Sequence, residues 1–374
     1  MRVGILKEML KNETRVAMLP EDIKTFLDKK ITFNVESNAG KKAFINDDNY
    51  KSEGINILNN IYDQSDLIIK INPPSLEEIE QMEKNTILIS LLSSFTNHEI
   101  IKKLKSQNIT SLGLDLIPRT TYAQSMDVLS SQSTVSGYCA VLNAACHIGK
   151  FFPMLMTPAG TIKPASVLVI GAGVAGLQAI ATASRLGAKV EAFDVRPAAR
   201  EQVESLGAKF LYMDLDDSAE SDKGYAVEMN EEFIRKEMEL LHNTSKKVDA
   251  IITTALIFGK PAPILIKDYM VSDMKPGSCI IDLAAENGGN CELTQPNKVI
   301  EHNNVFIDGT LNLPAQLPYD SSKMFSKNVS KLLNDIINDD LEINFDNDIL
   351  KECLVTHNGQ ITHERTKMII EGDQ

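Results

Sequence analysis

Three glycines with the spacing G-x-G-x-x-G lie in the middle of the chain. They follow an apolar run at residues 167–170 and open a segment rich in small residues, so the pattern predicts a strand, a tight turn and a helix. In such a unit the second glycine lets the backbone approach a phosphate, and the helix N-terminus offers unpaired N–H groups. The spacing therefore predicts a dinucleotide site. Its predicted phosphate-binding residues are Gly171, Gly173, Val174, Ala175 and Gly176.

A second predicted strand, residues 190–194, ends in Asp194. A carboxylate at this position accepts hydrogen bonds from ribose hydroxyls and repels a 2′-phosphate, which favours NAD over NADP. Arg196 and Arg200 leave an alternative open, because either could compensate a phosphate or simply lie in a solvated helix start. The remaining residues predicted to bind the cofactor in this part of the chain are Val195, Arg196 and Leu256.

Four polar residues precede the glycine-rich unit within about four helical turns: Arg119, Gln124, Asp127 and Ser130. One short element could present this cation, amide, carboxylate and hydroxyl toward a cleft between domains, where they would suit the carboxamide and ribose of nicotinamide. Alternatively, the segment is a polar hinge in which Asp127 or Ser130 caps a helix. The spacing alone leaves both interpretations open.

The elements that must position these residues alternate between strands and helices. This pattern predicts an α/β protein with two Rossmann-like domains and mostly parallel sheets, the first domain being split by insertion of the second. We expect an N-terminal domain at 1–135, completed by 311–374, and an NAD-binding domain at 136–310. The dipeptide Asn358-Gly359 predicts a hairpin turn in the last segment. The expected strands lie at 3–6, 32–36, 67–71, 86–92, 109–114, 248–253, 278–283 and 305–307.

The composition limits the partners and the compartment. The chain has 374 residues and a formal net charge of -13, which argues against nucleic acid as a partner. No apolar run has the length that spans a bilayer, and the first residues resemble a strand rather than a signal peptide, so we expect a cytoplasmic protein. Five cysteines without C-x-x-C spacing predict no metal site. The acidic segment 214–232 predicts a surface loop.

Several motifs extend beyond the glycine pattern. Residues 4–8, 13–17, 274–278 and 284–290 resemble segments shared by alanine dehydrogenases and the NAD(H)-binding alpha subunits of proton-translocating NAD(P) transhydrogenases. The block 118–132 is more specific, because it is similar to the transhydrogenase loop that holds the nicotinamide end of NAD. Residues 224–232 are similar to the mobile loop of that family. The resemblance to the transhydrogenase family covers nearly the whole chain.

This resemblance implies a function and a set of partners. Arg119, Gln124, Asp127 and Ser130 would act at the hydride-transfer site, Gln132 would contact the cofactor, and Gly224 with Tyr225 would close over the nucleotide. The protein would be an enzyme that passes hydride from NADH to NADP(H) on a beta subunit. It would work as a homodimer docked, on the cytoplasmic face of the inner membrane, to membrane-spanning subunits that translocate protons.

Two alternatives remain. An alanine dehydrogenase needs a general acid/base, yet residues 87–93 contain no histidine where that family has one, and Glu286 replaces its aspartate. Arg15 and Lys70 resemble its substrate-anchoring residues, and they could either grip a carboxylate or form structural ion pairs. A non-catalytic NAD-sensing subunit would carry the same glycine pattern. The chain departs from the transhydrogenase pattern at Tyr122, where a basic residue is expected.

Overall fold

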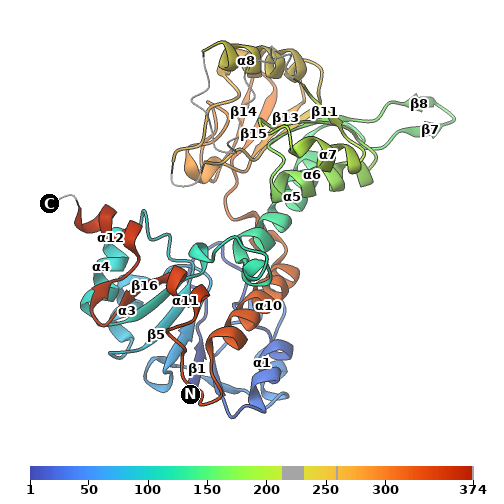
Figure 1. Cartoon of the computed structure of the whole chain (residues 1–374). Helices are drawn as coiled ribbons and strands as arrows, with labels where there is room; N and C mark the ends of the chain where they lie inside the picture. Colours follow the sequence, from blue (N-terminus) through green and yellow to red (C-terminus); the bar gives the residue numbers. More distant parts are fainter. Residues whose placement is uncertain (213–230, 258–259, 373–374) are drawn as a thin grey trace. The chain divides into compact units, whose positions relative to one another are not determined.

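The structure, a computed structural model, describes residues 1–212, 231–257 and 260–372 (Figure 1). The chain forms two compact units. Unit 1 comprises residues 1–132 and 314–374, and unit 2 comprises residues 133–313. The predicted α/β class with mostly parallel sheets is confirmed, and unit 1 is built from two separate stretches of chain.

Unit 1 contains an eight-stranded sheet in the order β17-β16-β6-β5-β4-β1-β2-β3. Strands β1 to β6 are parallel, and they follow the strand order 3-2-1-4-5-6 of a doubly wound dinucleotide fold. The hairpin β16–β17 adds an antiparallel edge, and its turn at Asn358 and Gly359 has positive φ at both residues, as the dipeptide predicted. The strands are β1 Arg2–Ile5, β2 Thr32–Glu36, β3 Asn56–Leu58, β4 Leu67–Ile69, β5 Ile87–Ser90, β6 Thr110–Gly113, β16 Leu354–His357 and β17 Gln360–Ile361.

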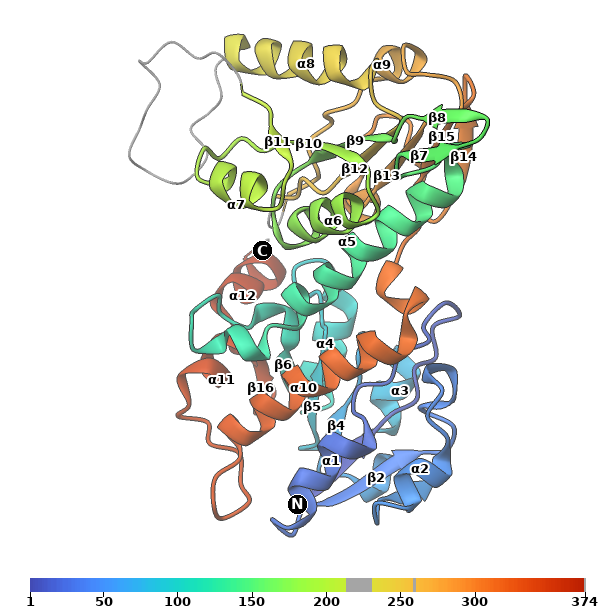
Figure 2. The same cartoon turned by 90° about the vertical axis from the view of Figure 1, so that its right-hand side faces the viewer.

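Helices cover both faces of this sheet. Alternate strand residues point to opposite sides, so Leu67 and Ile69 pack with helices α1, α10 and α11, whereas Ile68 packs with α3 and α4. Figure 2 shows α10 running across the strands. The helices are α1 Pro20–Leu27, α2 Asp47–Lys51, α3 Leu76–Gln81, α4 His98–Ser106, α10 Pro318–Ile336, α11 Asp348–Cys353 and α12 Glu364–Glu371, with 3-10 turns η1 Lys41–Ala43, η2 Tyr62–Gln64, η3 Leu114–Leu116, η4 Ala123–Met126 and η7 Leu313–Gln316.

Unit 2 contains a seven-stranded sheet in the order β11-β10-β9-β12-β13-β15-β14. It repeats the 3-2-1-4-5-6 order and then ends in the antiparallel strand β14. The strand order reverses between β9 and β12, and in open α/β sheets such a switch point is where ligands bind. The strands are β9 Ser166–Ile170, β10 Lys189–Phe193, β11 Lys209–Phe210, β12 Ala250–Thr253, β13 Cys279–Asp282, β14 Val299–His302 and β15 Val305–Asp308.

The helices of unit 2 also lie on both sides of its sheet, with α8 opposite α6 and α7 (Figure 1). Helix α5 begins in unit 1 and ends in unit 2. A two-stranded hairpin, β7–β8, protrudes from this unit (Figure 1). The elements are α5 Val128–His147, β7 Leu155–Thr157, β8 Gly160–Ile162, α6 Val174–Arg185, α7 Ala199–Ser205, α8 Glu231–Ser245, α9 Asp268–Ser272 and η6 Ala285–Asn287.

The sequence analysis missed three short elements, β3, β7–β8 and β14, because each is too short for a clear hydrophobic period. The predicted surface loop at 214–232 lies outside the described residues except for its last two, Glu231 and Glu232. These two residues belong to α8, which corrects the end of that loop.

Helix α5 packs against the start of α6 through Gly137. A Cβ atom at this position would lie 2.1 Å from the backbone oxygen of Ala175. Replacing a helical glycine by alanine normally gains about 1 kcal/mol. Here the overlap outweighs that gain, because overpacking a tight contact costs about 1 to 3 kcal/mol and the obstacle is backbone.

We therefore expect Gly137→Ala to lower the free energy of unfolding measured by urea titration. Gly149→Ala is the matched control, because a Cβ atom there meets nothing within 4 Å. Equal stability of the two variants would contradict the close packing of α5 on the glycine-rich turn.

Candidate functional site

The glycine-rich turn joins β9 to α6 at the switch point of unit 2. Gly171 has a φ of +97°, and a Cβ atom there would lie 2.5 Å from the hydroxyl of Thr254. A Cβ atom on Gly176 would lie 1.8 Å from the oxygen of Gly171. Around Gly173 there is open space, and no side chain caps α6. The turn thus leaves room for a ligand at the helix N-terminus, where a phosphate group would find N–H donors.

Asp194 follows β10 and points at this turn. Its carboxylate accepts hydrogen bonds from the backbone N–H of Ala172, at 2.7 Å, and from the backbone and guanidinium of Arg196. Burial opposes ionisation, but these hydrogen bonds outweigh it and lower the pKa of Asp194 below its ordinary value. Arg200 pairs instead with Glu204. The acid at the end of the second strand is therefore ionised and held beside the glycines.

Exposed apolar side chains surround the turn. Val174, Val195 and Leu256 are 44%, 45% and 54% exposed, and they follow β9, β10 and β12, which are neighbours in the sheet. The carboxyl ends of these parallel strands meet at one edge. Aliphatic side chains at this edge could cover the flat face of a base.

Sequence reasoning missed Asp282, which organises the neighbouring loop from the end of β13. This buried carboxylate accepts five hydrogen bonds, including those from the backbone N–H groups of Ala284 and Asn290. Asn290 in turn holds both the N–H and the oxygen of Ala255, the residue before Leu256. The available signal was an aspartate that ends an apolar strand shortly before two glycines.

The polar segment before α5 is not one helix, as its spacing had suggested. Arg119 is exposed in a turn, Gln124 is exposed in η4, and Asp127 adopts an extended conformation that ends this piece. The Asp127 carboxylate accepts from the N–H of Ser130 at 2.9 Å and from its hydroxyl at 2.6 Å. Asp127 therefore caps α5, which is the structural role that the spacing left open.

Tyr122, where a basic residue was expected, donates its hydroxyl to Asp335 on α10. Gln132 lies one turn into α5 and is buried. Its side-chain amide is engaged by Arg15 and by the backbone oxygen of Ser321. The predicted cofactor contacts Gly224 and Tyr225 lie outside the described residues.

The switch point of unit 1, between β1 and β4, holds a cluster of buried charges. Arg15 pairs with Glu13 at 2.6 Å, and Lys70 pairs with Glu78 at 2.7 Å. Glu8 accepts from the backbone N–H of Ile71, and burial raises the pKa of its carboxyl. Each cation thus has its own carboxylate, so the place where a substrate carboxylate could bind is filled by structural ion pairs.

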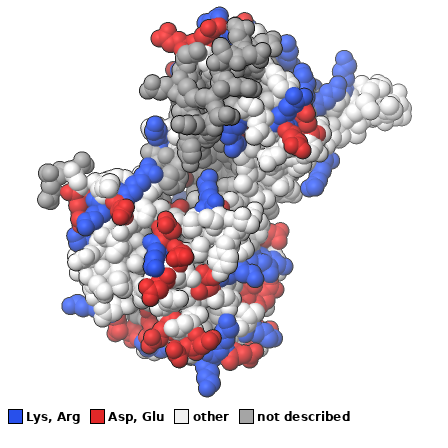
Figure 3. All heavy atoms as spheres, viewed as in Figure 1, with Lys and Arg blue, Asp and Glu red and all other residues white. Residues whose placement is uncertain are grey.

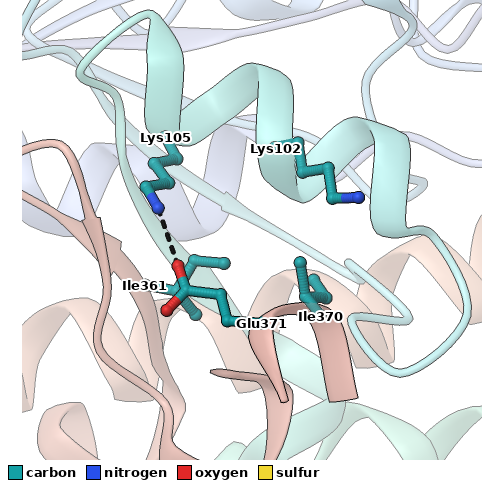
Figure 4. A pocket seen from close by; sticks show the side chains of 5 residues that line it. All are labelled: Lys102, Lys105, Ile361, Ile370 and Glu371. Atoms are coloured by element: carbon teal, nitrogen blue, oxygen red, sulfur yellow. Dashed lines mark hydrogen bonds and ion pairs between the residues drawn. The ribbon is translucent and has the colours of Figure 1, made fainter. Parts of the chain in front are cut away.

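A hollow on unit 1, between α4, β17 and α12, contains none of the predicted site residues (Figure 4). Lys105 and Glu371 form an ion pair across it, at 2.7 Å. Its lining residues are Lys102, Lys105, Ile361, Ile370 and Glu371.

Comparison with known proteins identifies the family. Residues 4–136 match the domain described as "Alanine dehydrogenase/PNT, N-terminal domain", and residues 140–364 match "Alanine dehydrogenase/PNT, C-terminal domain". The NAD(P) transhydrogenase subunit alpha of Haemophilus influenzae is 44% identical over 366 residues, which cover 96% of this chain and 71% of the relative. The first of the two chains that form this subunit in Rhodospirillum rubrum is 43% identical over 376 residues, covering 97% of this chain and 98% of the relative.

The chain belongs to the NAD(P) transhydrogenase alpha-subunit family. The resemblance stated from the motifs is therefore confirmed. The solved structure of a transhydrogenase from Sinorhizobium meliloti has a TM-score of 0.87 and 38% identity, and it covers 98% of this chain and 100% of that one.

Alanine dehydrogenases are more distant from this transhydrogenase alpha-subunit chain. One from Methanococcus maripaludis is 26% identical over 97% of this chain and 95% of its own length. The structure of an L-alanine dehydrogenase has a TM-score of 0.85 at 22% identity, covering 100% of this chain and 99% of that one, so this likeness concerns the fold alone. The transhydrogenase and alanine dehydrogenase families therefore share one architecture.

The buried pair in unit 1 predicts a pH dependence of stability for this family member. Burial opposes ionisation of Glu13, but the hydrogen bonds from Arg15 dominate and lower the pKa of its carboxyl from 4.5 to about 2. Because the folded pKa is the lower one, the stabilisation is complete above about pH 5 and is lost as the pH falls toward 2. The shift corresponds to about 3 kcal/mol.

We expect the unfolding free energy of the wild-type chain to fall more steeply between pH 5 and pH 2 than that of Glu13→Gln, as measured by denaturant titration. The exposed Asp48 gives a control, Asp48→Asn, which should keep the wild-type slope. Parallel slopes for wild type and Glu13→Gln would show that Glu13 is not the titrating group.

Proposed function

We propose that this chain is the NAD(H)-binding subunit of a proton-translocating NAD(P) transhydrogenase. It passes hydride from NADH to NADP⁺ on a beta subunit, and membrane-spanning subunits couple the transfer to proton translocation. Family membership supports this proposal, and the contrast between the two switch points carries it. Unit 2 offers open backbone to a pyrophosphate, whereas unit 1 fills the equivalent place with ion pairs.

In this proposal the chain's own residues bind and orient the nucleotide. The N–H groups at the start of α6 hold the pyrophosphate, and Asp194 accepts from the adenosine ribose. Bound NADH supplies the hydride. Arg119, Gln124, Asp127 and Ser130 fix the carboxamide and the nicotinamide ribose, so that one face of the ring is presented. Hydride transfer between two such rings needs alignment at near-attack distance rather than a general base.

The alanine dehydrogenase alternative lacks both groups that it requires. Strand β5, Ile87–Ser90, carries no histidine that could move the substrate proton. Arg15 and Lys70 are buried and already paired with carboxylates, so neither offers an unpaired cation to an amino acid. Charge neutralisation at this place thus favours transhydrogenation.

We also propose that the chain works as a homodimer attached to membrane-spanning partner subunits at the cytoplasmic face of the inner membrane. Among the described residues, no helix combines the length and apolarity needed to cross a bilayer. The protruding β7–β8 hairpin exposes Met154 and Met156, and Figure 3 shows no charged side chain at its tip. An apolar arm of this kind suits association with a second copy, which the mass of the assembly in solution tests.

The central experiment mixes the purified chain with an NADP(H)-loaded partner domain and follows hydride exchange with a spectrally distinct NAD analogue. The wild-type chain should exchange hydride and should not reduce NAD with alanine. Binding without exchange would favour the non-catalytic NAD-sensing subunit, and alanine-dependent reduction would favour the dehydrogenase.

In the same assay, Gln124→Ala and Asp127→Asn should slow hydride exchange by about 10- to 100-fold, because small misplacement of a reacting ring is costly. NADH affinity should fall far less. Asparagine keeps the helix cap while removing the charge, so Asp127→Asn separates binding from capping. Asn347→Ala removes the cap of α11 instead and serves as the control, which should leave exchange unchanged. Equal losses in affinity and rate would make Gln124 and Asp127 simple affinity contacts.

Asp194 should determine cofactor choice. We expect NADH to bind at least about tenfold more tightly than NADPH, or about 1.4 kcal/mol, because the ionised carboxylate repels a 2′-phosphate. Fluorescence titration should show this preference narrowed in Asp194→Ala. Arg200→Ala is the control, since Arg200 pairs with Glu204 and should leave the preference unchanged. Equal affinities of the wild-type chain for both nucleotides would refute this role of Asp194.

A further inference from the structure

Arg15 is buried in unit 1 with all three of its guanidinium nitrogens engaged. The Nε and Nη2 atoms donate to the two carboxylate oxygens of Glu13, at 2.8 and 2.6 Å. The Nη1 atom donates to the side-chain oxygen of Gln132, at 2.8 Å. One planar group therefore connects the loop after β1 with the second turn of α5.

The position of this guanidinium is determined from several sides. Glu13 is 1% exposed, and besides the guanidinium it accepts from the backbone N–H of Arg15 and from the amide of Asn72. Asn72 also donates to Glu8, so the loops after β1 and β4 are joined. A bidentate pair of this kind fixes orientation as well as charge. Arg15 accordingly behaves as part of a rigid scaffold.

Gln132 passes this restraint to helix α5. Its oxygen accepts from Arg15, and its nitrogen donates to the backbone oxygen of Ser321 on α10, at 3.1 Å. A side chain held from two directions limits rotation of the helix about its axis. Asp127 and Ser130 lie in the turn just before, joined by the capping hydrogen bonds. Their orientation depends on how that turn is held.

The same loop also contacts the segment by which the chain returns to unit 1. The hydroxyl of Thr14 donates to the backbone oxygen of Ala315, and the hydroxyl of Ser321 donates to that of Pro314. The chain leaves unit 1 after Gln132 and re-enters it at Pro314. Both crossings are thus anchored beside one buried ion pair.

We propose that Arg15 is a positioning residue for hydride transfer, which acts through Gln132 to orient Asp127 and Ser130 on α5. This role rests on the proposed function, because it assumes that these two residues hold the nicotinamide ribose. Gln132 then serves as the intermediary between the ion pair and the helix. An arginine that could anchor a substrate carboxylate is used here to align a cofactor-binding helix.

The test uses Arg15→Lys, which keeps the charge but loses the planar fork. With the full chain and an NADP(H)-loaded partner, we expect hydride exchange to slow by about 10- to 100-fold. NADH affinity should change less than about threefold, and amide hydrogen exchange in the first turns of α5 should speed up. Arg2→Lys is the matched control, because Arg2 forms a similar forked pair with Asp66 in the same unit. It should leave all three measurements unchanged.

A double-mutant cycle with Gln132→Met decides whether Arg15 acts through Gln132. If it does, Arg15→Lys with Gln132→Met should exchange hydride no more slowly than the slower single variant. Losses that multiply, or a wild-type rate in Arg15→Lys, would overturn the positioning role alone. A wild-type chain that binds NADH but exchanges no hydride would contradict the proposed function itself, and the positioning role with it.

Discussion

A charge removed from water must meet an opposite charge, and this constraint organises the carboxyl edge of the unit 1 sheet. Arg15 and Lys70 could not remain buried without Glu13 and Glu78, since an isolated buried ion costs several kcal/mol. Each pair also supplies local structure. Glu78 closes the capping box that starts α3, and Glu13 fixes the loop that contacts α5 through Arg15. Breaking one pair would therefore disturb more than its own charge.

Unit 2 meets a different requirement at the same topological position. It contains the strand order of unit 1, but its switch point is built from backbone and small residues. The close contact of Gly176 with Gly171 brings α6 onto β9, and the contact of Gly137 with Ala175 brings α5 onto α6. Two similar sheets thus have opposite ends: one is closed by ion pairs, and the other leaves N–H groups accessible at a helix N-terminus.

Local patterns were sufficient to predict much of this architecture. The strands around Gly171 and Asp194 and the turn at Asn358 followed from periodicity and glycine chemistry, because neighbouring residues determine them. The break at Asp127 did not follow, since spacing does not distinguish one helix from a 3-10 turn and a capped helix. Nor could the hydrogen bonds of Asp282, or the link from Arg15 to Gln132, be inferred, because their partners lie far apart in sequence. Contacts of this kind depend on tertiary packing.

The antiparallel pairing of β16 with β6 has a consequence for synthesis on the ribosome. The hydroxyls of Ser111 and Thr356 meet at 2.7 Å, although 245 residues separate them. The chain emerges from its N-terminus and domains fold as units. Unit 2, which is continuous, is therefore complete before the last strands of unit 1 leave the exit tunnel. The early part of unit 1 must wait with an unpaired β6 edge while a whole domain is made, and the late hairpin covers that edge.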